Sequence, residues 1–216
     1  MYSKLVASAP AKTNGSPVGE LSGRSALAGL PEQDPLNIDV AFVYSPTGRS
    51  SQRLMQNGAT LQTGDHYKIV IMPDKDCYMY LFQVDSAGRL YMLFPLDDLG
   101  ITATNPVGDG EPYFLPGAED SFILDEQTGL EKIFLLASHQ KDPVVEQLRG
   151  YFSGNTAPDL RKKAEEKLGV YLYSKQRVTE TSPGEPLVLS DQTSVTASKI
   201  ESLNSSRVYE FSFQHK

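Results

Sequence analysis

The stretch LQTGDHYKIVIMPDKDCYMYLFQVDSAGRLYMLFP, residues 61–95, decides the fold of this chain. It holds three apolar runs, Tyr67–Met72, Cys77–Val84 and Leu90–Phe94, which short polar turns separate. Runs rich in Tyr, Val, Ile and Phe between turns of Asp, Gly, Ser and Pro are typical of antiparallel strands joined by tight connections. The stretch therefore predicts an antiparallel meander of three strands.

The middle run carries apolar side chains on both faces of the predicted strand. Cys77, Met79 and Leu81 point one way. The alternate positions, which point the other way, are Tyr78, Tyr80, Phe82 and Val84. A strand with two apolar faces is covered on both sides, as in a sandwich or under a helix.

Further strand signals run through the rest of the chain. They are Ile38–Tyr44, a weaker Ser51–Met55, Glu111–Leu115, Phe122–Leu124, Lys132–Ser138, Val170–Tyr173, Pro186–Leu189 and Arg207–Phe213. The last strand alternates, with Tyr209, Phe211 and Phe213 on one face. A Ser/Thr-rich stretch that runs to Ser206 shows no strand pattern beyond Pro186–Leu189. We therefore expect a mainly β fold, an antiparallel sandwich or a similar arrangement.

Two short helices are expected near residues 142–168, inserted after the Lys132–Ser138 strand. Asp142-Pro143 is an N-cap followed by a proline at the first helical position. The apolar side chains of this helix are Val145, Leu148 and Phe152, and Gly154-Asn155 ends it. The second helix has Thr156 as its cap, Leu160, Ala164 and Leu168 as its apolar stripe, and Gly169 as its C-terminal residue.

The domain organisation follows from these patterns. Residues 1–35 are rich in Ala, Ser, Gly and Pro, so we expect a flexible or docking N-terminal arm. Residues 36–216 are expected to form a single β-rich domain that contains the helical insertion 142–168. The arm has two candidate docking places, its own domain or a neighbouring subunit, and the second would make the protein self-associate.

Composition excludes several classes of protein. The 216 residues carry a net charge of −7, which disfavours nucleic acid as a partner. The basic cluster Arg161-Lys162-Lys163 is followed at helical spacing by Glu165 and Glu166, which favours pairing within a helix. No apolar stretch is long enough to span a membrane. One cysteine allows no intrachain disulfide. Met1-Tyr2-Ser3-Lys4 does not begin an export signal, and we expect any such signal to be absent from this sequence.

The residues predict no catalytic constellation and no cofactor. Cys77 lies within an apolar strand, where a thiol is normally a small buried side chain with a raised pKa. The histidines His66, His139 and His215 stand in no recognised motif, and no phosphate-binding or nucleophile-elbow motif is present.

The carboxylates leave one alternative open. Six aspartates lie in turns or loops near the meander and could in principle bind calcium: Asp74, Asp76, Asp85, Asp97, Asp98 and Asp109. Aspartates in turns more commonly bind their own backbone, so no metal site is predicted. Asp97-Asp98 and Glu165-Glu166 are the adjacent carboxylate pairs that we considered for acid–base work. The alternative is a hydrolase or regulatory enzyme with a carboxylate or metal site in the 95–116 loop.

The tyrosines of the meander have two interpretations. Tyr67, Tyr78, Tyr80 and Tyr91 could form a platform on which a ligand stacks. At strand spacing, such side chains more commonly pack in the core and across strands.

An ordered series of motifs resembles the bacterial family DUF4384, a domain of unknown function. The motifs are Gly58-Ala59-Thr60-Leu61-x-x-Gly64-Asp65-x-Tyr67-Lys68-Ile69, Asp76-Cys77-Tyr78-x-Tyr80-Leu81-Phe82-Gln83-x-Asp85-x-x-Gly88, Leu93-Phe94-Pro95, Asn105-Pro106-Val107, Leu115-Pro116, Phe122-x-Leu124-Asp125, Gly129-x-Glu131-x-Ile133 and Leu136-Ala137-Ser138. The resemblance covers about residues 36–150.

The resemblance implies a non-catalytic, β-rich module of an exported protein, without assigned catalytic residues. We therefore expect a protein-interaction or structural module of a bacterial cell-envelope or secreted protein, located in the periplasm or outside the cell. Its partners are expected to be proteins, as in a subunit of a larger assembly.

Overall fold

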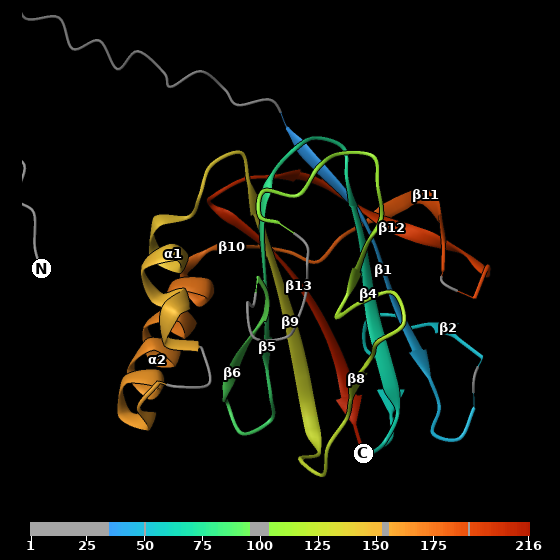
Figure 1. Cartoon of the computed structure of the whole chain (residues 1–216), viewed down its shortest axis with the longest axis horizontal. Coiled ribbons are helices and arrows are strands. Elements are labelled where there is room, and N and C mark those ends of the chain that lie inside the picture. The colour runs from blue at the N-terminus through green and yellow to red at the C-terminus, as the bar shows by residue number, and fades with distance from the viewer. Residues whose placement is uncertain (1–34, 50, 96–103, 153–155, 190) are drawn as a thin grey trace, which may run out of the picture. The chain divides into compact units, whose positions relative to one another are not determined.

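Two sheets and a pair of helices make up the described part of the chain (Figure 1). The computed structural model describes residues 35–49, 51–95, 104–152, 156–189 and 191–216, which belong to one compact unit, Gln33–Lys216. In chain order the elements are β1 (Leu36–Ser45), β2 (Arg53–Leu54), β3 (Thr60–Leu61), β4 (His66–Pro73), β5 (Tyr78–Val84), β6 (Leu90–Phe94), β7 (Tyr113–Leu115), β8 (Phe122–Ile123), β9 (Gly129–Ser138), α1 (Pro143–Arg149), the 3-10 helix η2 (Gly150–Phe152), α2 (Pro158–Ser174), β10 (Gln176–Val178), β11 (Ser182–Val188), β12 (Ser194–Leu203) and β13 (Arg207–His215).

The strands divide between a seven-stranded and a six-stranded sheet. The first sheet has the order β11-β12-β1-β4-β7, with β2 on β1 and β8 on β4. The second has the order β10-β13-β9-β5-β6, with β3 on β13. All pairings are antiparallel except those of β10 and β3 with β13. The mainly β fold with two short helices is therefore confirmed.

The predicted three-stranded meander is wrong in one pairing. The three strands exist, and β5 pairs with β6, but β4 pairs with β1 in the other sheet. The turn after β4 explains the crossing, because Asp74 is tied to the start of β1. Its carboxylate accepts from the backbone N–H of Asn37 at 2.9 Å and from the Asn37 side chain at 2.8 Å. This fixed turn directs the chain into the second sheet.

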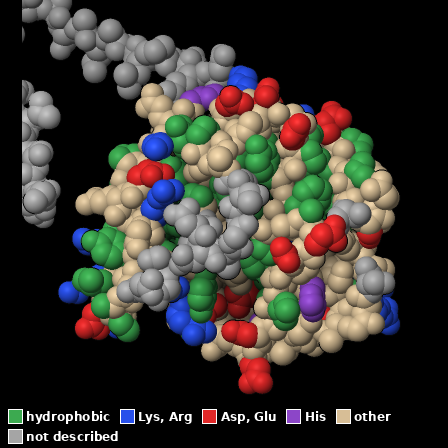
Figure 2. All heavy atoms as spheres, viewed as in Figure 1, with side chains coloured by type: hydrophobic (Ala, Val, Ile, Leu, Met, Phe, Trp, Pro, Cys, Tyr) green, Lys and Arg blue, Asp and Glu red, His purple; other side chains and the backbone are tan. Residues whose placement is uncertain are grey.

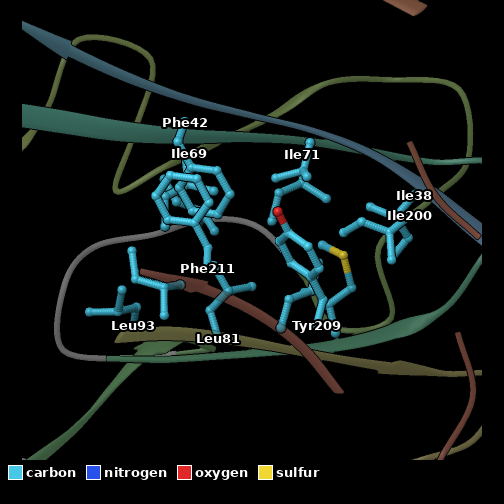
Figure 3. Packing of buried hydrophobic residues seen from close by; sticks show 14 of the residues in the cluster. Ile38, Phe42, Ile69, Ile71, Leu81, Leu93, Ile200, Tyr209 and Phe211 are labelled. Atoms are coloured by element: carbon cyan, nitrogen blue, oxygen red, sulfur yellow. The ribbon is translucent and has the colours of Figure 1, made fainter. Parts of the chain in front are cut away.

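The main core lies between the two sheets (Figure 3). Phe42, Ile69 and Ile71 from the first sheet face Leu81 and Phe211 from the second. The rings of Phe42 and Phe211 stack with their centroids 3.7 Å apart. The predicted inward faces are confirmed, because this core contains Cys77, Met79, Leu81, Tyr209, Phe211 and Phe213.

The helices cover the outer face of the second sheet, as Figure 1 shows. A second core there joins Tyr80 and Phe82 of β5 to Phe134 and Leu136 of β9 and to the helices. β5 is thus covered on both sides, as predicted, by a sheet and by helices. α1 begins as expected: the Asp142 carboxylate accepts from the backbone N–H groups of two residues in the first turn at 3.0 Å. Its predicted apolar side chains, Val145, Leu148 and Phe152, are buried.

The predicted end of the second helix is wrong. α2 runs through Gly169 to Ser174, so Val170–Tyr173 is helical and not a strand. Gly169 costs this helix about 1 kcal/mol relative to alanine. The burial of Leu172 against the second sheet outweighs that cost, and the buried stripe is Ala164, Leu168 and Leu172. Leu160 is 49% exposed, and α2 is capped by Ala157 and not by the Thr156 side chain.

The Ser/Thr-rich stretch contains more strand structure than the sequence predicts. It forms most of the β11–β12 hairpin and places β12 beside β1. The buried residues of β12 are Ala197, Ile200 and Leu203, at a spacing of three and not two. Ile200 and Leu203 both belong to the main core, and a register irregularity in the β1–β12 pairing and a positive φ at Ser202 account for the spacing between them. Ala197 is buried in a separate cluster on the other face of the sheet. Alternation therefore could not reveal this strand.

Two further expectations concern the N-terminal arm and membrane-spanning segments. The arm over residues 1–35 falls, except for Pro35, outside the described residues and stays a prediction. Among the described helices, none has the length and apolar character needed to cross a membrane.

Candidate functional site

A pocket of about 340 Å³ opens at one end of the sandwich, beside the edge strand β6. It is lined by Tyr67, Gln83, Asp85, Tyr91, Met92, Leu93, Phe122, Ile123, Leu124, Asp125, Glu131, Phe152, Arg161 and His215. Figure 2 shows acidic side chains recessed in the lower part of the drawn face, where Figure 1 places the ends of β5, β8 and β9. We call this site the edge pocket.

A chain of hydrogen bonds crosses the floor of the edge pocket. The Tyr67 phenol donates to Oε1 of Gln83 at 2.6 Å, and the Gln83 amide donates to Oε2 of Glu131 at 3.0 Å. Tyr67 comes from β4 in one sheet, whereas Gln83 and Glu131 come from β5 and β9 in the other. The chain therefore joins the two sheets and fixes the orientation of a carboxylate that is only 2% exposed.

The environment of Glu131 makes its charge costly. Burial is the main cause that raises the pKa of Glu131, and the neighbouring Asp85 raises it further. The hydrogen bonds from Gln83 and the Ser86 backbone, and the imidazole of His215, lower this pKa without cancelling the effect of burial. A positive group that entered the pocket would stabilise the ionised carboxylate.

Asp85 forms part of the wall next to Glu131. Its carboxylate accepts from the backbone N–H groups of Ala87 and Arg89 at 2.9 and 2.8 Å and from the Arg89 guanidinium at 2.7 Å. The same guanidinium lies 5.8 Å from the centre of the Tyr91 ring. Asp85 therefore shapes its turn, as the sequence predicts, and also places a cation beside an aromatic ring at the edge of the pocket.

Aromatic rings supply most of the apolar wall. Tyr67 and Phe122 lie with their ring centroids 5.1 Å apart, and Tyr91 faces the same side of the second sheet as Gln83. Tyr80 belongs to the opposite face of β5, where its hydroxyl donates to Glu146 at 2.9 Å, and Tyr78 packs against the same helical core. The proposed platform of four tyrosines is thus divided between the pocket and the helical core.

Three polar residues of the pocket were missed as a group. Gln83 and His215 occupy inward positions after the apolar residues of β5 and β13, and Glu131 occupies the inward position before those of β9. The predicted strands began at Lys132 and ended at Phe213, so Glu131 and His215 fell just outside them. The signal that could have found them is a polar side chain at the inward position at the same end of three paired strands.

His215 has a second contact outside the pocket lining. Its Nε2 and the hydroxyl oxygen of Thr63 are 3.0 Å apart, which is a hydrogen bond. Thr63 is exposed and does not line the edge pocket. Of the other histidines, His66 is exposed at the start of β4 and His139 is half-buried after β9. The geometry does not combine the three imidazoles into one site.

Cys77 is buried in the main core, as predicted. Its side chain is 1% exposed, and burial, followed by the charges of Asp74 and Asp76, raises the pKa of Cys77 to about 12. A thiol with such a pKa is a poor nucleophile at neutral pH. Cys77 therefore contributes packing to the fold.

The loop carboxylates mostly bind backbone groups. Asp74 binds Asn37, and Asp76 accepts from the backbone N–H of Asp109 at 3.1 Å. Asp97 and Asp98 lie outside the described residues. Within the ranges that the structure describes, no three His, Cys, Asp or Glu side chains are grouped so that they could hold a metal ion.

The other candidate pair and the basic cluster lie on α2. Arg161 binds Glu165 at 3.0 Å, which confirms pairing within the helix. Glu165 and Glu166 line a separate groove between α2 and the β5–β6 turn. A surface helix pair of this kind contributes little to stability, about 0.3–0.5 kcal/mol.

Comparison with known proteins identifies one family over the centre of the chain. Residues 60–141 match the family model described as "Domain of unknown function (DUF4384)". The match is shorter than the predicted resemblance over residues 36–150. A search of curated proteins found no match. Eight of the pocket residues lie in the motifs that carry the resemblance: Tyr67, Gln83, Asp85, Leu93, Phe122, Leu124, Asp125 and Glu131. The family whose model matches residues 60–141 is thus the one that the motifs of the sequence predict.

Proposed function

We propose that this chain is a non-catalytic interaction module that binds a segment of a partner protein in the edge pocket. The observation that carries the proposal is the convergence of the family motifs on this pocket: eight of its lining residues come from five motifs that are separate in the sequence. Turns and strand ends alone do not require the side chains of such distant motifs to face one cavity.

The pocket has the composition of a binding site. Its walls are mostly apolar and aromatic, and a few oriented polar groups lie at the floor, which is the arrangement that fixes and selects a bound group. Ile123 stands at its rim and is 61% exposed, so a partner can contact it without any rearrangement of the core. The position beside the edge strand β6 makes the pocket accessible to an extended segment.

Binding without chemistry fits the side chains of the pocket. Gln83 is hydrogen-bonded to both Tyr67 and Glu131, and the positions of the three residues are fixed by the two sheets. Among the described residues that line the pocket, none is a serine, threonine or cysteine. The described lining therefore offers recognition groups and no hydroxyl or thiol nucleophile of the serine, threonine or cysteine type.

The cellular setting is part of the same proposal. The resemblance to DUF4384 supports an exported bacterial protein of the periplasm, envelope or exterior, in which the module is a subunit of a larger assembly. Fractionation of the native bacterium with an antibody against this chain tests the location. Recovery of the protein only in the cytoplasmic fraction would contradict it.

The binding proposal is tested by capture of partners from the native envelope fraction. Wild-type protein is compared with Ile123→Lys, which places a positive charge at the pocket rim, and with Val170→Lys. Val170 is 73% exposed on α2 and does not line the pocket, so it is a matched control. We expect a stoichiometric partner to be retained by the wild type and the control and lost by the rim variant. Equal capture by all three proteins, or covalent change of the partner on incubation, would contradict the proposal.

A further inference from the structure

The charges that line the edge pocket do not cancel. Among the described residues that line it, the acidic ones are Asp85, Glu131 and Asp125, and Arg161 is the only arginine or lysine. Arg161 binds Glu165 at 3.0 Å, and Asp85 binds Arg89 at 2.7 Å, so each has a partner of opposite charge outside the pocket lining. The carboxylates of Glu131 and Asp125 make no salt bridge to a lysine or arginine among the described contacts. The pocket is therefore an acidic recess with aromatic walls.

We propose that the edge pocket binds an arginine or lysine side chain that a partner protein presents. This inference rests on the proposed function and specifies the chemistry of the bound segment. Charge complementarity argues for it, because a cation meets Glu131 and Asp125 while its alkyl stem lies along Tyr67, Leu93 and Phe122. A positively charged group over an aromatic face is attracted by the ring as well.

The molecule already holds one of its own cations in a similar setting at the pocket edge. The Arg89 guanidinium binds the Asp85 carboxylate and lies 5.8 Å from the centre of the Tyr91 ring. The same two kinds of group, a carboxylate and an aromatic ring, line the pocket at Glu131 and Phe122, where the described contacts give Glu131 no lysine or arginine and the imidazole of His215 is the basic group that acts on it. A guanidinium fits such a site well because it is planar and donates several hydrogen bonds in fixed directions.

The burial of Glu131 strengthens the attraction between its carboxylate and a bound cation. Its side chain is 2% exposed, so water screens its charge poorly, and Gln83 holds one carboxylate oxygen in place. Burial raises the pKa of Glu131, and an entering cation would favour its ionised form. Binding should therefore release a proton when it is measured near that pKa.

The test uses the full chain, labelled with ¹⁵N, and blocked pentapeptides that differ only in the central residue. We expect the arginine and lysine peptides to shift the amide signals of Gln83, Ile123 and Glu131 in a saturable manner. Peptides with norleucine or glutamate at the centre should bind at least tenfold more weakly. Spermidine and methylguanidine distinguish a peptide side chain from a free cation. If either bound as tightly as the arginine peptide, the assignment to a protein segment would fail.

Substitutions of charged residues identify which carboxylate binds the cationic side chain of the peptide. Glu131→Gln should weaken the arginine peptide at least tenfold, whereas Arg161→Gln, which removes a repelling charge, should strengthen it severalfold. Glu180→Gln removes an equal charge at an exposed position after β10 and should change nothing. Equal weakening by Glu131→Gln and Glu180→Gln would overturn the proposal, because it would show only the effect of net charge.

The outcomes separate the two proposals. If the norleucine peptide bound as well as the arginine peptide, and Ile123→Lys still abolished partner capture, the pocket would remain an interaction site and the assignment of a basic side chain would be wrong. If no peptide shifted the pocket signals and Ile123→Lys captured the partner normally, both proposals would fail.

Discussion

The phenol of Tyr67 in one sheet donates a 2.6 Å hydrogen bond to the side-chain amide of Gln83 in the other sheet. Tyr67 is 2% exposed, and burial raises the pKa of its phenol, so the hydroxyl stays protonated and able to donate at neutral pH. This contact connects the sheets at the end where they enclose the pocket, and so it couples stability to the shape of the site.

Removal of this hydroxyl should destabilise the protein. Tyr67→Phe keeps the ring against Phe122 but leaves Oε1 of Gln83 without its donor, and we expect a loss of about 1 kcal/mol. Urea unfolding measures the change. Tyr151→Phe is the control, because Tyr151 is 40% exposed and should change stability by much less. Equal effects of the two changes would contradict the stabilising role of the contact.

The carboxyl of Glu131 should make stability depend on pH. Its folded pKa is raised by burial above its value in the unfolded chain, so protonation stabilises the folded state. That contribution is full below the unfolded pKa and is lost as the pH rises through the folded pKa. Relative to Glu131→Gln, the wild type should therefore gain stability as the pH falls from about 8 to about 5.

Urea unfolding of both proteins across this range measures the difference. The groups that act on Glu131 from neighbouring strands and turns, Asp85 and His215, are present in both proteins, so the comparison isolates the one carboxyl. A difference that stays constant with pH, or that favours the variant at low pH, would show that the pKa of Glu131 is not raised.

Cys77 should not react in the folded protein. Because burial raises its pKa to about 12, roughly one thiol in ten thousand is ionised near pH 8, and the core also excludes the reagent. Iodoacetamide should label Cys77 only after the protein is unfolded in urea, as mass spectrometry can follow. Rapid labelling of the native protein would place the thiol in an open site and would support the enzymatic alternative.

Asp142 should be important for the position of the helices. One carboxylate oxygen caps α1, and the other accepts from the Tyr171 hydroxyl at 2.5 Å and lies 3.7 Å from the ammonium of Lys175. The side chains of Asp142 and Lys175 are 1% and 6% exposed. Asp142→Ala removes a cap and leaves a buried lysine without its carboxylate, so we expect a cost of about 3 kcal/mol or more.

A second change tests the cause of that cost. Lys175→Met in the Asp142→Ala background removes the isolated charge and should recover part of the lost stability. Asp159→Ala, in the exposed first turn of α2, is the control and should cost about 1 kcal/mol at most. The effect of Lys175→Met on the free energy of unfolding is therefore measured in the wild type and in the Asp142→Ala variant. If Lys175→Met lowered the stability equally in both, the two residues would act independently, and the explanation by an isolated charge would be wrong.

Most strands of this fold could be predicted because their side chains alternate or are apolar on both faces. The two faces of β5 and the inward face of β13 followed directly from the positions of their tyrosines and phenylalanines. The pairing of β4 could not be predicted in this way, because periodicity gives a strand but not its neighbour. The contact of Asp74 with Asn37, which directs the chain to the other sheet, joins residues 37 positions apart.

The pocket was harder to predict than the fold. Gln83 stood inside a predicted strand, but Glu131 and His215 lie at strand ends, where sequence boundaries are least certain. Their common role in the pocket follows only from the strand order β13-β9-β5, because that order brings three inward polar residues to one end of the sheet. The predicted second helix ended too early, because a glycine such as Gly169 is a strong signal for the end of a helix. The packing of Leu172 outweighs that signal, and α2 continues to Ser174.

β5 and β9 are covered by the other sheet on one face and by the helices on the other, and this arrangement predicts which related chains have the helices. The family match ends at residue 141, just before α1, so the helices lie beyond it. Tyr80, Phe82, Phe134 and Leu136 are apolar or aromatic because the helices cover them. A homologue whose corresponding four positions are polar should therefore present this sheet face bare to solvent and should have no helical layer at all.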